Sequence, residues 1–216
     1  MGRYEEAIAS FDKAIALDPN DAEAHYNCGL ALDDLGRYEE AIASYDKAIA
    51  LDPNLAVAYN NRGIALALMG RYEEAIASFD KAIALDPDYA EAHYNRGLAL
   101  KDMGRYEEAI ASYDQAIALD PDYADAYNNC GNAFLKMDCY EEALDYVNKA
   151  IEIDEGDSIS YDTRAEILLN LKRYEEALKD IDKAIELNPQ EPHHQELRQD
   201  ILSAMNNPDN NESAKE

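Results

Sequence analysis

The sequence is poor in basic residues and contains no tryptophan. Its 216 residues include 46 Asp and Glu but only 19 Lys and Arg, which gives a formal net charge of −27. Binding to nucleic acid through its phosphates requires clustered Lys and Arg, so this composition argues strongly against a nucleic-acid partner. It also argues against an anionic membrane surface. We expect most of the acidic side chains to lie on solvated surface.

Long apolar runs and paired cysteines are also missing. No run of about 18 apolar residues is present, so we expect no transmembrane helix. The sequence also has no charged start followed by an apolar stretch, so we expect no signal peptide. The cysteines are odd in number and form no CxxC pair: Cys28, Cys130 and Cys139. Free thiols are typical of a reducing compartment, which predicts a cytoplasmic protein.

Residues that would carry chemistry are few. We find no nucleophile–His–acid grouping, phosphate-binding loop or metal-ligand cluster. His193 and His194 are adjacent, and neighbouring residues of a helix point to different faces, which disfavours a shared metal. We therefore predict no enzyme, no metal and no cofactor.

The most prominent feature of the sequence is a repeated nine-residue segment. The nine residues GRYEEAIAS occur four times, and two altered copies, DCYEEALDY and KRYEEALKD, follow. The spacing is 34 residues, and a fixed period in this range predicts a stacked array in which each unit packs on its neighbours. The six copies begin at Gly2, Gly36, Gly70, Gly104, Asp138 and Lys172.

Each period contains two helical patterns. In residues 22–55, small or apolar residues spaced three and four apart predict a first helix, and Gly36 is expected to end it in a left-handed conformation. A second helix is expected from about Tyr38 to Leu51, because Pro53 prevents its continuation. The residues expected to cap the first helices are Asn20, Asp88 and Asp122.

Small residues inside the first helices predict close packing. A mid-helix glycine costs about 1 kcal/mol relative to alanine, so its recurrence indicates close approach of two helix backbones. The glycines are Gly29, Gly63, Gly97 and Gly131. The large side chains expected to fill the space between units are Phe11, Tyr45, Phe79, Tyr113, Val147 and Ile181.

These features together resemble the tetratricopeptide repeat. The small residue eight places into each unit, the Gly–x–Tyr turn, the alanines, the aromatic and the proline match that family's pattern over residues 1–191. Departures include Glu155 in place of the proline and Ala165 in place of the mid-helix glycine. The resemblance implies an all-α solenoid of antiparallel helix pairs wound into a right-handed superhelix.

The positions of the repeated segment predict the organisation of the chain. Residues 1–21 would form a half repeat with the second helix alone, and residues 22–191 five complete units of 34 residues. Residues 192–206 carry one apolar stripe and are expected to form a capping helix. Residues 207–216 have no apolar anchor and are expected to be disordered.

The resemblance implies that the first helices line a concave groove that binds a peptide. One asparagine recurs in each of the first four complete units, and its amide offers the donor and acceptor that a peptide backbone requires. The alternative is that these asparagines bond the neighbouring unit. The predicted peptide-binding residues are Asn27, Asn61, Asn95, Asn129, Tyr26, Asn60, Tyr94, Asn128, Leu30, Ile64, Leu98 and Lys101.

The charge of the expected groove predicts the kind of ligand. The positions that the resemblance turns into the groove carry eight acids and two bases, Lys101 and Lys136. The set of basic residues with which some relatives hold acidic chaperone tails is absent from these positions. Arg62, Arg96 and Arg164 lie one place past the position of the recurring asparagine, which is Asn61, Asn95 and Thr163 in their units, and could reach either way. We expect a neutral or basic, partly apolar protein segment.

Three functions are consistent with the sequence. The leading one is a non-enzymatic scaffold that binds an extended peptide or a helix of a partner protein. The second is a self-assembling array, a homo-oligomer formed through the apolar residues of the helix expected over residues 2–20. The third is a regulatory module belonging to a larger enzyme or sensor.

Overall fold

The computed structural model describes residues 2–207, which form 12 α-helices and no β-strand. All but the first residue of the tail expected over residues 207–216 lie outside the described part. The helices are α1 (Gly2–Leu17), α2 (Ala22–Asp33), α3 (Tyr38–Leu51), α4 (Ala56–Leu68), α5 (Tyr72–Leu85), α6 (Ala90–Asp102), α7 (Tyr106–Leu119), α8 (Ala124–Lys136), α9 (Tyr140–Ile153), α10 (Ser158–Asn170), α11 (Tyr174–Leu187) and α12 (Pro192–Asn206).

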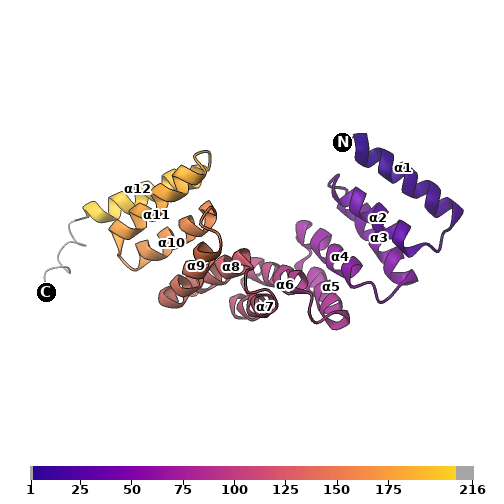
Figure 1. Cartoon of the computed structure of the whole chain (residues 1–216), viewed down its shortest axis with the longest axis horizontal. Coiled ribbons are helices and arrows are strands. Elements are labelled where there is room, and N and C mark those ends of the chain that lie inside the picture. Colours follow the sequence, from indigo (N-terminus) through magenta and orange to yellow (C-terminus); the bar gives the residue numbers. More distant parts are fainter. Residues whose placement is uncertain (1, 208–216) are drawn as a thin grey trace. The chain divides into compact units, whose positions relative to one another are not determined.

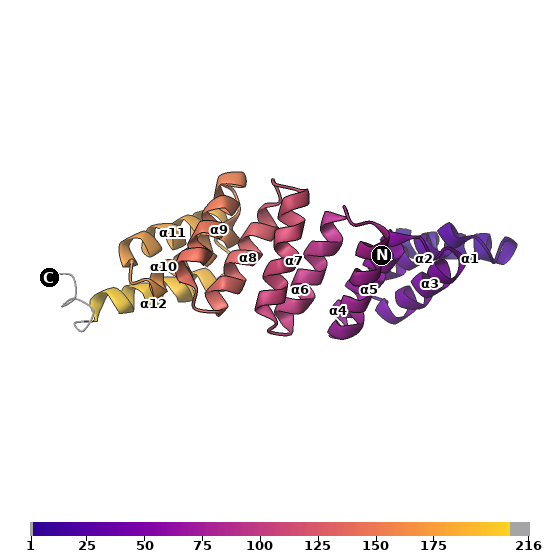
Figure 2. The ribbon, with the colours of Figure 1, turned by 90° about the horizontal axis from the view of Figure 1, so that it is seen from below.

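The chain divides into two compact units, the first ending at Leu119 and the second beginning at Asp120. In the first unit, α2 pairs with α3, α4 with α5 and α6 with α7, and α1 packs on α2 (Figures 1 and 2). In the second unit, α8 pairs with α9 and α10 with α11, and α12 packs on α11 (Figure 1). The all-α fold of consecutive antiparallel helix pairs is confirmed.

The turn inside each pair adopts the expected left-handed conformation. The φ angles of Gly36, Gly70 and Gly104 are 73°, 74° and 73°. In the two altered copies, Asp138 and Lys172 hold the same conformation with φ of 60° and 59°, although neither is a glycine. The backbone N–H of the next residue closes the turn in each case, for example Arg173 on the carbonyl of Leu168 at 2.9 Å.

The expected helix caps are wrong. Asn20, Asp88 and Asp122 do not cap the first helices, because the N-cap positions lie one residue later, at Asp21, Tyr89 and Tyr123. The backbone N–H groups of the three predicted caps donate instead to the aspartate two residues earlier. This local turn around the proline delays the start of the helix. Asp21 is the N-cap of α2, where its side chain accepts from the N–H of Ala24 at 3.0 Å.

The core of each helix pair depends on a contact between residues 16 positions apart. The aromatic rings of Tyr45 and Phe79 are 0% and 1% exposed, and each covers the glycine of the preceding helix. A Cβ added to Gly63 would lie 2.5 Å from Cε1 of Phe79. The glycine therefore makes room mainly for a ring, rather than for a helix backbone as the sequence suggested. In the last pair the two residues are Ala165 and Ile181, both 0% exposed.

Helix α12 completes the core of the second unit. Leu197 and Ile201 are buried in the same apolar cluster as Leu168 and Ile181. His194 is also buried, at 2% exposure.

The side chains of the two adjacent histidines differ in exposure, 55% for His193 and 3% for His194, so they lie on different faces of α12 although both reach toward Asp162. The Nε2 atoms of His193 and His194 lie 3.5 and 3.9 Å from the two carboxylate oxygens of Asp162.

The apolar residues of α1 pack against the rest of the first unit. Ile8 belongs to a buried cluster with Cys28 and Tyr45, and Phe11 and Ile15 pack against that cluster. Assembly through this helix stays a prediction.

Replacing Lys172 by glycine should stabilise the protein. An L-residue in the left-handed conformation costs about 1–2 kcal/mol, and the greater freedom of glycine in the unfolded chain offsets part of the gain. We expect Lys172→Gly to raise the free energy of unfolding by about 0.5–1 kcal/mol in urea titrations followed by circular dichroism. The matched change Gly104→Lys should lower it. A shift of the same sign in both variants would contradict this account of the turn.

Adding a methyl group at Gly63 should destabilise the first unit unless the facing ring is also reduced. Gly63→Ala should cost about 1–2 kcal/mol, because overpacking exceeds the gain in helix propensity. Combining it with Phe79→Ile creates the Ala–Ile pair that occurs at Ala165 and Ile181. A double-mutant cycle should show a favourable coupling of about 1 kcal/mol. Additive changes would mean that the two side chains do not constrain each other.

Candidate functional site

The candidate site is the surface formed by α2, α4 and α6, which we call the α2–α4–α6 face. These are the first helices of the three pairs in the first unit, and α4 contacts both α2 and α6 (Figure 2). Because the pairs have the same length, residues 34 apart occupy equivalent positions on neighbouring helices. The predicted binding residues of the first unit therefore form rows that cross the three helices.

The row of asparagines is tied together by hydrogen bonds between helices. Nδ2 of Asn61 donates to the hydroxyl of Tyr26 on α2 at 3.0 Å, and Nδ2 of Asn95 donates to Oδ1 of Asn60 on α4 at 3.1 Å. Asn60 also donates to Oδ1 of Asn61 at 3.3 Å. The asparagines thus do bond the neighbouring unit, which was the alternative interpretation of the row. Asn27, Asn61 and Asn95 all remain partly exposed.

Two asparagines predicted to contact a ligand are not accessible. Asn60 and Asn128 are only 4% and 7% exposed, because they lie between helices instead of on the outer surface. We correct their assignment from ligand contacts to structural residues. In the second unit, Nδ2 of Asn129 donates to the backbone carbonyl of Asp125 on its own helix at 2.9 Å.

The tyrosines of the face have a structural role as well. The ring of Tyr26 packs against Tyr45 with centroids 6.0 Å apart, and the ring of Tyr94 packs against Tyr113 at 5.8 Å. Burial raises the pKa of Tyr26, although the hydrogen bond from Asn61 acts in the opposite direction. Tyr26 is therefore a neutral hydroxyl near pH 7, able to accept the bond from Asn61.

An apolar row runs beside the asparagines and ends in an open hollow. Leu30, Ile64 and Leu98 are half-buried at equivalent positions. Between α4 and α6 lies a hollow of about 180 Å³, lined by Ile64, Ala67, Leu68, Phe79, Asn95, Leu98, Ala99 and Asp102. Leu68 is 60% exposed at its rim, which makes it one of the most exposed large apolar side chains of the described residues. The resemblance to the family placed Leu68 among the groove positions, but it was not among the predicted peptide-binding residues; both equivalent residues of the face, Asp34 and Asp102, are acidic.

The charged residues of this face lie at the ends of its helices. Asp33 is the last residue of α2 and Asp34 is its C-cap, and Asp102 is the last residue of α6. Burial, and then the neighbouring charge of Asp34, raise the pKa of Asp33. Burial lowers the pKa of Lys101, whereas the nearby Asp102 acts to raise it. The face is therefore predominantly negative.

The two arginines that follow Asn61 and Asn95 turn away from this face. Nε of Arg62 donates to Oδ1 of Asp46 on α3 at 2.6 Å, and its Nη1 donates to Oγ of Ser78 on α5 at 2.6 Å. Arg96 makes the equivalent bonds to Asp80 and Ser112, each at 2.7 Å. Each arginine thus links the second helices of two consecutive pairs, and it is not available to a ligand on the α2–α4–α6 face.

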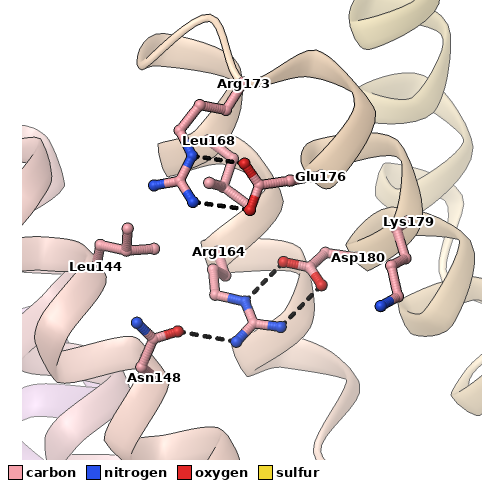
Figure 3. A pocket seen from close by; sticks show the side chains of 8 residues that line it. All are labelled: Leu144, Asn148, Arg164, Leu168, Arg173, Glu176, Lys179 and Asp180. Carbon is pink, nitrogen blue, oxygen red and sulfur yellow. Dashed lines mark hydrogen bonds and ion pairs between the residues drawn. The ribbon is translucent and has the colours of Figure 1, made fainter.

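Arg164 occupies the equivalent position in the second unit, where its main partner is a carboxylate bound through both oxygens. It donates to both carboxylate oxygens of Asp180 at 2.6 and 2.8 Å and to Oδ1 of Asn148 at 2.8 Å (Figure 3). The hollow around it has a volume of about 210 Å³. Arg173 in its wall is already paired with Glu176 (Figure 3). These pairings make the hollow a structural ion-pair site.

Family models match most of the chain. Models described as tetratricopeptide repeat match residues 1–56, 44–77, 124–157 and 163–191, and a model described as TPR repeat matches residues 65–104 and 98–138. The chain belongs to the tetratricopeptide repeat family. TPR proteins act as scaffolds for protein interactions, and the family expected from the sequence is confirmed.

Solved structures of TPR arrays are similar to the chain. A crystal structure of MamA is 34% identical, with a TM-score of 0.69, over 71% of this chain and 90% of MamA. YrrB, described as a TPR protein with an unusual peptide-binding site, is 26% identical, with a TM-score of 0.70, over 88% of this chain and 97% of YrrB. TTC0263, a TPR protein of Thermus thermophilus, is 21% identical, with a TM-score of 0.65, over 85% of this chain and 98% of TTC0263. This likeness shows a shared fold alone. No curated protein matches the chain.

None of the helices between residues 2 and 207 combines the length and the apolar character needed to cross a bilayer.

Removing Arg164 should cost more stability than removing Arg96. The Asp180 side chain is 8% exposed, so Arg164→Ala would leave a buried carboxylate unpaired and cost about 3 kcal/mol in urea unfolding. Asp80 is 53% exposed, so Arg96→Ala should cost at most about 1 kcal/mol. Combining Arg164→Ala with Asp180→Ser, which copies Ser78 and Ser112, should recover most of the loss. Equal losses in the two arginine variants would contradict this assignment.

Proposed function

We propose that the chain is a non-enzymatic scaffold that binds an extended segment of a partner protein on the α2–α4–α6 face. The observation that carries this proposal is the row of partly exposed asparagine amides, Asn27, Asn61 and Asn95, beside the apolar row of Leu30, Ile64 and Leu98. An amide row can bond the backbone of a peptide, while an apolar row can cover its side chains.

The hydrogen bonds between helices support this function, because they fix the orientation of the amides before a ligand arrives. Asn95 uses one N–H group toward Asn60, and an asparagine side chain has a second N–H and a carbonyl acceptor. A side chain held in place loses less conformational entropy on binding. The same bond can therefore support both the packing of the array and recognition of a ligand.

The charge of the face supports a neutral or basic ligand. Five acidic groups lie at the positions of α2, α4 and α6 that the family turns toward a ligand, Glu23, Asp33, Asp34, Glu91 and Asp102, against the single base Lys101. An acidic segment would be repelled, since like charges brought together on a partly desolvated surface are unfavourable. The peptide-binding site attributed to YrrB, to which the chain is 26% identical, is consistent with peptide binding by such an array.

The proposal is tested with peptides selected on the full chain from a random 12-residue display library. Their dissociation constants are then compared by fluorescence anisotropy between the chain and the variant Asn27→Ala/Asn61→Ala/Asn95→Ala. Each lost hydrogen bond is worth about 1 kcal/mol, so binding should weaken by about 10- to 100-fold.

The matched control is Asn54→Ala, an exposed asparagine in the loop between α3 and α4. It should leave the dissociation constants unchanged. Circular dichroism has to show that the triple variant retains its helices. Unchanged affinity in a folded triple variant, or selection of predominantly acidic peptides, would refute the proposed function.

A further inference from the structure

The hollow between α4 and α6 has the size and lining of a pocket for one side chain. Its volume of about 180 Å³ lies below the roughly 300–1,000 Å³ of small-molecule sites. Its apolar walls come from Ile64, Leu68 and Leu98, and Asn95 of the asparagine row lies on its rim. Leu68 is 60% exposed, which leaves apolar surface open to a partner. An aliphatic side chain of a peptide bound along the asparagines would fit this site.

Negative charge lies one helix away, at the end of α2. Asp33 and Asp34 occupy the positions on α2 that Ala67 and Leu68 occupy on α4. They lie at a helix C-terminus, where the helix dipole is itself negative, and the last turn of α2 contains no basic residue. Oδ1 of Asp33 is buried and has no hydrogen-bond partner among the described residues. A cation brought by a ligand would relieve this accumulation of negative charge.

We propose that the α2–α4–α6 face selects a partner segment that carries an aliphatic residue and, on the side toward α2, a lysine or arginine. The aliphatic side chain enters the hollow beside Leu68, and the cation lies against Asp33 and Asp34. The order of the two groups follows from geometry. The hollow lies between α4 and α6, and the two aspartates lie on the other side of α4, at the end of α2, so the cation belongs on the α2 side of the aliphatic residue.

Two further features of the face agree with this selectivity. Asp102 in the wall of the hollow disfavours an acidic residue beside the aliphatic one. The raised pKa of Asp33 reflects a carboxylate that burial and Asp34 make unfavourable, so a bound cation should lower that pKa again. The inference rests on the proposed function, because it names the ligand of the same face.

The test uses peptides selected from the random 12-residue library on the full chain. We expect them to share an aliphatic residue with Lys or Arg at a fixed position on one side of it. Leu68→Ser should raise their dissociation constants about ten-fold or more, because the contact with the aliphatic side chain is lost. Asp33→Asn/Asp34→Asn should raise them by about three- to ten-fold and should make binding less sensitive to salt.

The matched control for Leu68→Ser is Leu85→Ser, which alters an exposed leucine at the end of α5, outside the face. It should leave binding unchanged, and circular dichroism should show that every variant is folded. Peptides that depend on the three asparagines but not on Leu68 or the two aspartates would overturn this inference and leave the proposed function standing. Failure to select any peptide that depends on the asparagines would overturn both.

Discussion

The contact on which the rest of the structure depends joins the small residue inside each first helix to the large side chain 16 positions later. It requires a residue without a long side chain at Gly29 or Gly63, because the ring of Tyr45 or Phe79 occupies the space above the helix. Since each ring is almost completely buried, the contact fixes both the separation and the register of the two helices. The 34-residue period follows, because each pair must present the same surface to the next pair.

Helix bounds that depend on nearby residues in the sequence could be predicted, whereas contacts between residues on different helices could not. The bounds of α3, Tyr38–Leu51, follow from a glycine turn before the helix and Pro53 after it. The caps were wrong because the turn in which Asp18 accepts from the N–H of Asn20 moves the cap to the next residue, and sequence patterns do not rank such alternatives. The burial of Asn60 and its bond with Asn95 depend on the distance between two helices, which no local pattern contains.

The arginines illustrate the same limit for long side chains. The position of Arg62 and Arg96 lies between the inner and outer sides of the helix, and the side chain is long enough to reach either. The outcome depends on partners 16 residues away in both directions, an aspartate on the preceding second helix and a serine on the following one. In the last pair the serine is replaced by Asp180, which turns a surface link into a bidentate, largely buried ion pair. The repeats in the sequence show that an aspartate and a serine recur 16 residues before and after these arginines, but only the three-dimensional structure shows that they are in contact.

The near-identity of the first three pairs makes their few differences informative about recognition. Their turns, glycines and second helices are almost the same, so packing requires little of the positions that differ. At two equivalent positions, however, α2 carries Asp33 and Asp34, α4 carries Ala67 and Leu68, and α6 carries Lys101 and Asp102. Three helices of nearly identical packing thus present three different chemistries along one surface. The exposed Leu68, between the acidic residues Asp34 and Asp102, contributes little to the packing of the array. Recognition of a ligand with complementary apolar and basic groups would explain why the three helices differ at these positions.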